Sequence, residues 1–163
     1  MNHDEDFTQF AQARAEKLRA TAFMLCRDWH LAQDLTQTTL TKLYVGWRRA
    51  RQADNLTAYA QKVLVRVYLD HRRRRSSAEA VTAEVHDAGY RQSPDLRLTM
   101  LDALGRLPAR DRAIVILRYF EDYTVEQVAD VLDVPVSVVK TQTKRSLERL
   151  RGLLAAEQLA LFG

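Results

Sequence analysis

The side chains of residues 136–151 have the types and the spacing that contact with nucleic acid requires. This stretch holds five Lys and Arg against one Glu, and its apolar residues recur at helical spacing, which leaves the polar ones on one outer face. Hydroxyls and amides on such a face match base edges, and cations match phosphates. An αα-hairpin with a solvated charged face gives the same pattern, so both interpretations stay open at this point. The side chains predicted to face outward are Ser137, Lys140, Thr141, Gln142, Lys144 and Arg145.

A second group of basic residues lies in the first half of the chain. Three arginines are predicted in a loop before a helix, and two further cations on the outer face of that helix. Tyr59 lies on the apolar stripe of the same helix, where it either packs in the core or stacks on an unpaired base. The run Arg72–Arg75 is by default a solvated helix end. The five cations are Arg48, Arg49, Arg51, Lys62 and Arg66.

Residue types that perform catalysis are present but lack the required spacing. The four histidines are scattered, and no pair has a metal-ligand interval. There is no phosphate-cradling glycine loop and no nucleophile elbow. The single cysteine, Cys26, excludes an internal disulfide framework and a cysteine-based zinc finger. We therefore expect no enzymatic activity, no metal and no cofactor.

Helical periodicity dominates the elements that must position these residues. Thr124 and Gln127 form a capping-box pattern before an apolar run, and Pro135 suits the first turn of the next helix. A short helix, a tight turn and a second helix of this kind constitute a helix-turn-helix. No segment alternates apolar and polar residues as a strand does, so the sequence predicts an all-α fold. The predicted helices cover residues 7–27, the stripe from 31 to 47, residues 56–75, 96–107, 110–120 and 124–132, and the segment from 136.

The charge distribution divides the chain into three parts. The net charge is +6 over residues 1–75, −3 over 76–95 and +1 over 96–163. We read these as a basic helical domain, an acidic flexible linker and a helix-turn-helix domain. The linker is short of apolar residues and ends at Pro94. No signal peptide or membrane span is visible, so we expect a soluble, cytoplasmic protein.

Two segments of the first domain resemble the sigma factors of the extracytoplasmic function group, in the sigma-70 family of RNA polymerase sigma factors. Residues 32–40 resemble the segment that binds core polymerase, with Thr38 standing where the family usually has Glu. Residues 56–74, with Tyr68-Leu69-Asp70-His71-Arg72-Arg73, resemble the helix that opens and reads the −10 element. The resemblance assigns core binding to Asp34, Leu35, Gln37 and Thr38. It assigns the −10 element and its melted strand to Arg48, Arg49, Arg51, Tyr59, Lys62 and Arg66.

Residues 107–145 resemble the domain of the same family that reads the −35 element. They contain Leu107-Pro108-x-x-x-Arg112 and a second helix in which Ser137 and Val138 stand where the family commonly has Gly-Thr. The resemblance implies a sigma factor whose partners are core RNA polymerase, promoter DNA and an anti-sigma factor. The −35 contacts it assigns are Ser137, Val138, Lys140, Thr141, Gln142, Lys144 and Arg145.

Other interpretations remain at this stage. A helix-turn-helix repressor or activator with an N-terminal dimerisation or sensing domain fits the same helices, and so does a sigma-like adaptor that no longer initiates. The linker either threads the polymerase channel or serves only as a solvated tether. A repressor binds its operator alone, whereas a sigma factor needs core polymerase, and this difference separates the classes.

Overall fold

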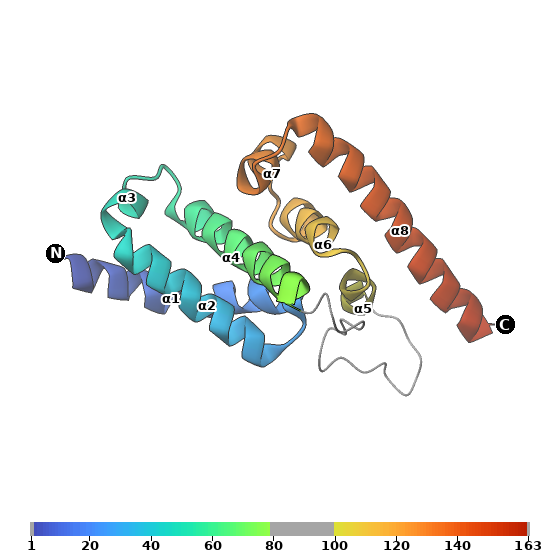
Figure 1. Ribbon diagram of the computed structural model, residues 1–163, viewed down its shortest axis with the longest axis horizontal. Coiled ribbons are helices and arrows are strands. Elements are labelled where there is room, and N and C mark those ends of the chain that lie inside the picture. Colours follow the sequence, from blue (N-terminus) through green and yellow to red (C-terminus); the bar gives the residue numbers. More distant parts are fainter. Residues whose placement is uncertain (1, 79–99, 163) are drawn as a thin grey trace. The chain divides into compact units, whose positions relative to one another are not determined.

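The computed structural model describes residues 2–78 and 100–162, and within these ranges every regular element is a helix (Figure 1). The all-α prediction is therefore confirmed. The chain divides into two compact units, residues 1–85 and 86–163. The predicted linker lies outside the described residues from position 79 onward. Its first three residues, 76–78, belong to the preceding helix instead.

The first unit is a bundle of three long helices and one short one. Asn2 caps the first helix, its side-chain oxygen accepting a hydrogen bond from the Glu5 backbone N–H at 2.8 Å. This cap explains why the helix begins at residue 3 and not at the predicted residue 7. Asp28 and Asn55 cap the second and fourth helices in the same way. The helices are α1 His3–Cys26, α2 Trp29–Val45, α3 Trp47–Arg51 and α4 Leu56–Ala78.

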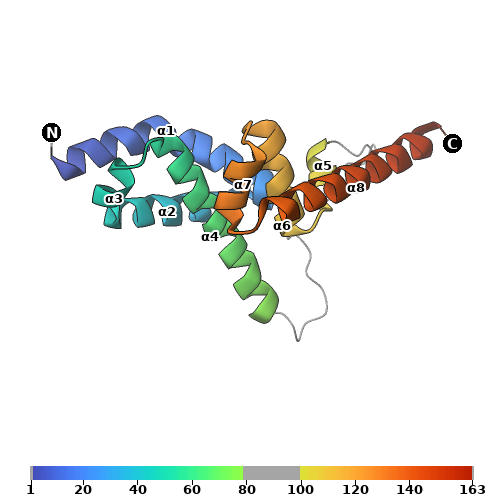
Figure 2. The ribbon, with the colours of Figure 1, turned by 90° about the horizontal axis from the view of Figure 1, so that it is seen from above.

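The core of the first unit lies between α1, α2 and α4, which pack against one another. The apolar stripes predicted for these helices meet there, and Tyr68 is fully buried among them. Figure 2 shows the C-terminal half of α4 extending beyond α1 and α2. The run Arg72–Arg75 stands on this half, which keeps its cations near solvent. The buried apolar residues include Leu18, Leu25, Leu35, Leu43, Leu64 and Val65.

The predicted loop that carries Arg48, Arg49 and Arg51 is a helix, α3. The Gly46 carbonyl accepts hydrogen bonds from the backbone N–H groups of Arg49 and Ala50, at 3.1 and 2.9 Å, which closes the turn. Trp47 and Ala50 are buried on its inner side. A single helical turn has no apolar repeat long enough to register as periodicity, so the sequence pattern could not reveal it.

The second unit is built on the long helix α8, against which α5, α6 and α7 pack. In Figure 1, α7 lies beside the first turns of α8. The helix predicted over 110–120 instead consists of α6 followed by a π-helical turn, in which the Glu121 N–H reaches the Ile116 carbonyl at 3.0 Å. The elements are α5 Met100–Gly105, α6 Ala109–Val115, η1 Ile116–Phe120, α7 Val125–Leu132 and α8 Val136–Phe162.

The arginine of the Leu107-Pro108-x-x-x-Arg112 motif is structural. Its side chain is buried and donates to three backbone carbonyls, those of Leu104, Gly105 and Leu107, at 2.8, 2.9 and 3.0 Å. Carbonyls at the end of a helix have no partner within the helix. Arg112 therefore satisfies the end of α5 and fixes the turn into α6.

Candidate nucleic-acid and polymerase interfaces

The helix-turn-helix of the second unit forms as the local sequence predicts. The Thr124 hydroxyl accepts from the Gln127 N–H at 3.1 Å, and the Gln127 side chain accepts from the Thr124 N–H at 2.8 Å, which completes the capping box. Asp133 then takes a left-handed conformation, with φ 58°, and ends α7. The carbonyl of Pro135 accepts from the first free N–H groups of α8. Pro135 therefore stands just before the helix, where its missing N–H costs nothing.

The outer face of α8 is polar and basic. Ser137, Lys140, Thr141, Lys144 and Arg145 are exposed, whereas the buried positions of the helix are Val139, Ser146 and Leu150. Within the described part of the chain, the cations at 140, 144 and 145 form no ion pair. Their charge is therefore available to an outside partner.

Two of the predicted −35 residues are less accessible than the others. Val138 and Gln142 are half-buried. The Oε1 atom of Gln142 is buried and has no hydrogen-bond partner among the described residues.

The basic residues of α3 differ in how far their charge is compensated. Arg48 and Arg49 are exposed and form no ion pair within residues 2–78. The Nε atom of Arg51 lies 2.8 Å from the Asp6 carboxylate, although 54% of the Arg51 side chain stays exposed. Nothing in the sequence pattern links Asp6 to this group, since it stands more than forty residues earlier on another helix.

The basic end of α4 is compensated in the same way. Asp70 accepts hydrogen bonds from Arg73 and from Arg74, the latter at 2.7 Å. The bond from Arg73 lowers the pKa of the Asp70 carboxyl from its ordinary value. Upstream on α4, Arg66 is exposed, and Tyr59 and Lys62 are half-buried. Tyr59 thus keeps a surface for stacking while part of its ring packs.

Three of the predicted polymerase-binding residues are exposed, and the fourth is buried. Asp34, Gln37 and Thr38 are exposed on one side of α2. Leu35 is only 3% exposed, so the prediction that it contacts polymerase does not fit its burial. Its side chain instead holds α2 against the rest of the unit.

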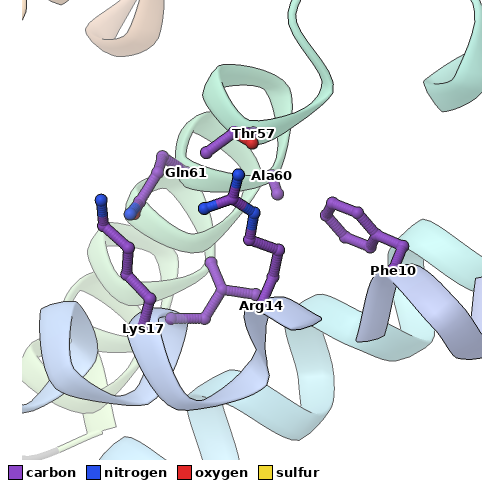
Figure 3. Close-up of a pocket in the computed structure, with 7 residues that line it drawn as sticks. Phe10, Arg14, Lys17, Thr57, Ala60 and Gln61 are labelled. Atoms are coloured by element: carbon purple, nitrogen blue, oxygen red, sulfur yellow. The ribbon is translucent and has the colours of Figure 1, made fainter. Parts of the chain in front are cut away.

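A small pocket lies between α1 and α4, at the first turns of α4 (Figure 3). Its volume of about 10 Å³ holds about one water molecule, far below the roughly 300–1,000 Å³ of ordinary small-molecule sites. Gln61 closes it, donating to the Thr21 hydroxyl at 3.3 Å. Arg14 and Lys17 lie on its rim. The apolar spacing of α1 does not indicate either residue, because both are charged. The lining is Phe10, Arg14, Lys17, Leu18, Thr57, Ala60 and Gln61.

The described residues contain neither a metal-binding cluster nor a membrane-spanning helix. Across 2–78 and 100–162, no three His, Cys, Asp or Glu side chains gather as a metal site would require. None of the helices in those ranges is long and apolar enough to cross a membrane.

Comparison with known families matches both units. Residues 10–78 match the family described as Sigma-70 region 2, and residues 103–152 match Sigma-70, region 4. The RNA polymerase sigma-E factor of Streptomyces avermitilis is 30% identical over 98% of this chain and 92% of its own length. The chain belongs to the extracytoplasmic function group of the sigma-70 family. As a sigma factor it is an initiation factor and not an enzyme, and it directs promoter-dependent transcription through RNA polymerase inside the cell.

Further relatives agree with this assignment. The sigma factor SigV of Bacillus subtilis is 27% identical over 85% of both chains. The solved structure of the sigma factor RpoE of Bartonella quintana, in complex with the anti-sigma factor NepR, matches 93% of this chain and 98% of its own with a TM-score of 0.73 and 25% identity. The matches to two sigma regions do not favour the alternative of a helix-turn-helix regulator with a sensing domain.

Proposed function

We propose that this sigma factor divides promoter recognition between its two units. The outer face of α8 enters the major groove of the −35 element, with Thr141, Lys144 and Arg145 near the bases. Lys140 and Gln142 contact the backbone, and Ser137 and Val138 border the groove. The observation that carries the proposal is the row of exposed cations at 140, 144 and 145 on α8, which form no ion pair with the described residues, because phosphates and guanine edges are the partners that such a row selects.

The first unit takes the −10 element and the polymerase. Arg48 and Arg49 on α3 supply uncompensated positive charge for the phosphates of the melted strand, with Arg51, Lys62 and Arg66 beside them. Tyr59 offers a ring for an unstacked base. The exposed side chains of Asp34, Gln37 and Thr38 form the polymerase contact, because an acidic group among them disfavours DNA at that place.

The two contacts need not be strong separately. Core polymerase holds both units at one promoter, so the second contact forms at a high effective concentration. By analogy with the Bartonella protein, we propose an anti-sigma factor as a further partner, and the cytoplasm as the place of action. The domain limits we propose are 1–75, 76–95 and 96–163, with the last helix of the first domain continuing to residue 78.

Transcription in vitro tests this function. The full chain and purified core polymerase are incubated with genomic promoter fragments, and the products are mapped. We expect transcripts from defined start sites only when both proteins are present. A specific shift of promoter fragments by the free chain, with no gain from core polymerase, would instead support a classical regulator.

A further inference from the structure

The first turns of α1 pack against the junction between α2 and α3. This segment lies ahead of residue 10, where the match to sigma region 2 begins. The Tyr44 hydroxyl donates to Asp4 at 2.8 Å, and the Phe7 ring packs edge-on against Tyr44 and Trp47. The match to region 2 therefore does not account for these contacts.

Asp6 on α1 contacts the first and the last residue of α3. One carboxylate oxygen, Oδ2, accepts from the Trp47 indole N–H at 3.2 Å and lies 2.8 Å from the Nε atom of Arg51. Trp47 is 2% exposed, and the side chain of Asp6 is 24% exposed. The Trp47 side of this contact is therefore sheltered, whereas the Arg51–Asp6 pair is partly screened by water, since 54% of the Arg51 side chain is exposed. Both ends of α3 are thus bound to one atom of α1.

This double contact fixes the rotation of α3. Residues 47 and 51 are four positions apart, so they share one side of the helix. Residues 48 and 49 follow at 100° steps, which turns their side chains away from Asp6. A helix of five residues has little stability of its own. The contacts of Trp47 and Arg51 with Asp6 therefore determine the direction in which Arg48 and Arg49 point.

We propose that Asp6 is a positioning residue for the strand-binding surface of the sigma factor. It orients α3 through Trp47 and Arg51, so that Arg48 and Arg49 face the melted strand. This inference rests on the proposed function, in which those two arginines bind the strand.

The test follows strand opening by the full chain bound to core polymerase. A promoter with 2-aminopurine in the −10 element reports opening, and core affinity and thermal midpoint are measured in parallel. We expect Asp6→Asn to slow opening about tenfold, since it removes the charge that orients Arg51. Core affinity and the thermal midpoint should stay near those of the wild type. Asp6→Ala, which also loses the Trp47 bond, should slow opening further.

A matched control lies one residue away. Glu5 is exposed on the same turn, and within residues 2–78 its side chain contacts no partner. Glu5→Gln removes the same charge and should open the promoter at the wild-type rate. In an Arg51→Ala background, Asp6→Asn should add little, because its effect passes through that arginine.

Three results would overturn the inference. One is equal opening rates for Asp6→Asn, Glu5→Gln and the wild type. Another is a loss of core affinity or thermal midpoint that matches the loss of opening, since Asp6 would then serve folding alone. The third is a full, additive effect of Asp6→Asn in the Arg51→Ala background. Failure of the wild-type chain to open any promoter would be different, because it would contradict the proposed function itself.

Discussion

The two surfaces that we propose to bind DNA differ in how far their cations are paired with carboxylates. On α8, Lys140, Lys144 and Arg145 form no ion pair with any described residue. In the first unit, carboxylates hold three of the arginines, with Asp6 on Arg51 and Asp70 on Arg73 and Arg74. Net charge thus overstates what the first unit offers to phosphate.

The largest effect expected from a single change concerns the polymerase contact that we propose for α2. Asp34→Arg places a cation in the exposed acidic patch of α2, and charge reversal at an interface costs about 2–5 kcal/mol. Affinity for core polymerase should fall about 30-fold or more in a fluorescence titration. Glu16→Arg, an exposed charge reversal on α1, should leave the affinity unchanged. Unaltered core binding by Asp34→Arg would move the interface elsewhere.

The next prediction separates the two roles on α8. Arg145→Ala should relax the preference at one base pair of the −35 element, by about 1–3 kcal/mol if the contact is bidentate to guanine. Lys140→Ala should weaken all sequences alike and lower the salt slope by about 1. Binding of the holoenzyme to a set of −35 variants at several salt concentrations measures both. Uniform losses for both variants would remove the division of labour.

A third prediction compares the arginines of α3 that form no ion pair with Arg51, which pairs with Asp6. Arg48→Ala with Arg49→Ala removes two uncompensated charges and should lower the salt slope for a single-stranded −10 oligonucleotide by about 0.7 per phosphate contact. Arg51→Ala should lower it less, because its charge is shared with Asp6. Titration of the holoenzyme with the labelled strand gives the slopes. A larger loss for Arg51→Ala would mean that DNA displaces the carboxylate.

The smallest effect concerns the pH dependence of the first unit. Burial lowers the pKa of His71 below 6.5, assisted by Arg75, Arg72 and Arg74 and opposed by Asp34. The unfolded chain therefore binds the proton more readily, so stability is complete above pH 6.5 and declines as the pH falls below it. His71→Gln should flatten this decline between pH 7.5 and 5.5 in thermal unfolding, whereas His30→Gln, at an exposed site, should not. Residues 100–162 contain no histidine, so their unfolding gives an internal reference.

The sequence was most informative where contacts are local. The capping box of Thr124 and the stripes of the long helices are encoded within one or two turns, so composition and spacing suffice to predict them. The outer face of α8 followed for the same reason. The matches to sigma regions 2 and 4 confirmed the family that the motifs of both halves resembled.

Features that depend on distant residues were not predictable. Leu35 belongs to the predicted polymerase-binding motif but is buried, because a motif does not reveal which side of α2 the other helices cover. The pairing of Asp6 with Arg51 joins residues that come together only in the folded unit. The π-helical turn at Ile116 changes the bonding without changing residue type, so the apolar spacing did not mark it.

The buried arginine of the second unit has a consequence for the order in which the protein assembles. Arg112 binds carbonyls only five to eight residues earlier in the chain, so closing these contacts costs little chain entropy. The turn from α5 to α6 can form as soon as that short stretch has left the ribosome. The Trp47–Asp6 bond instead joins residues 41 positions apart, so fixing α3 against α1 requires closure of a much longer loop.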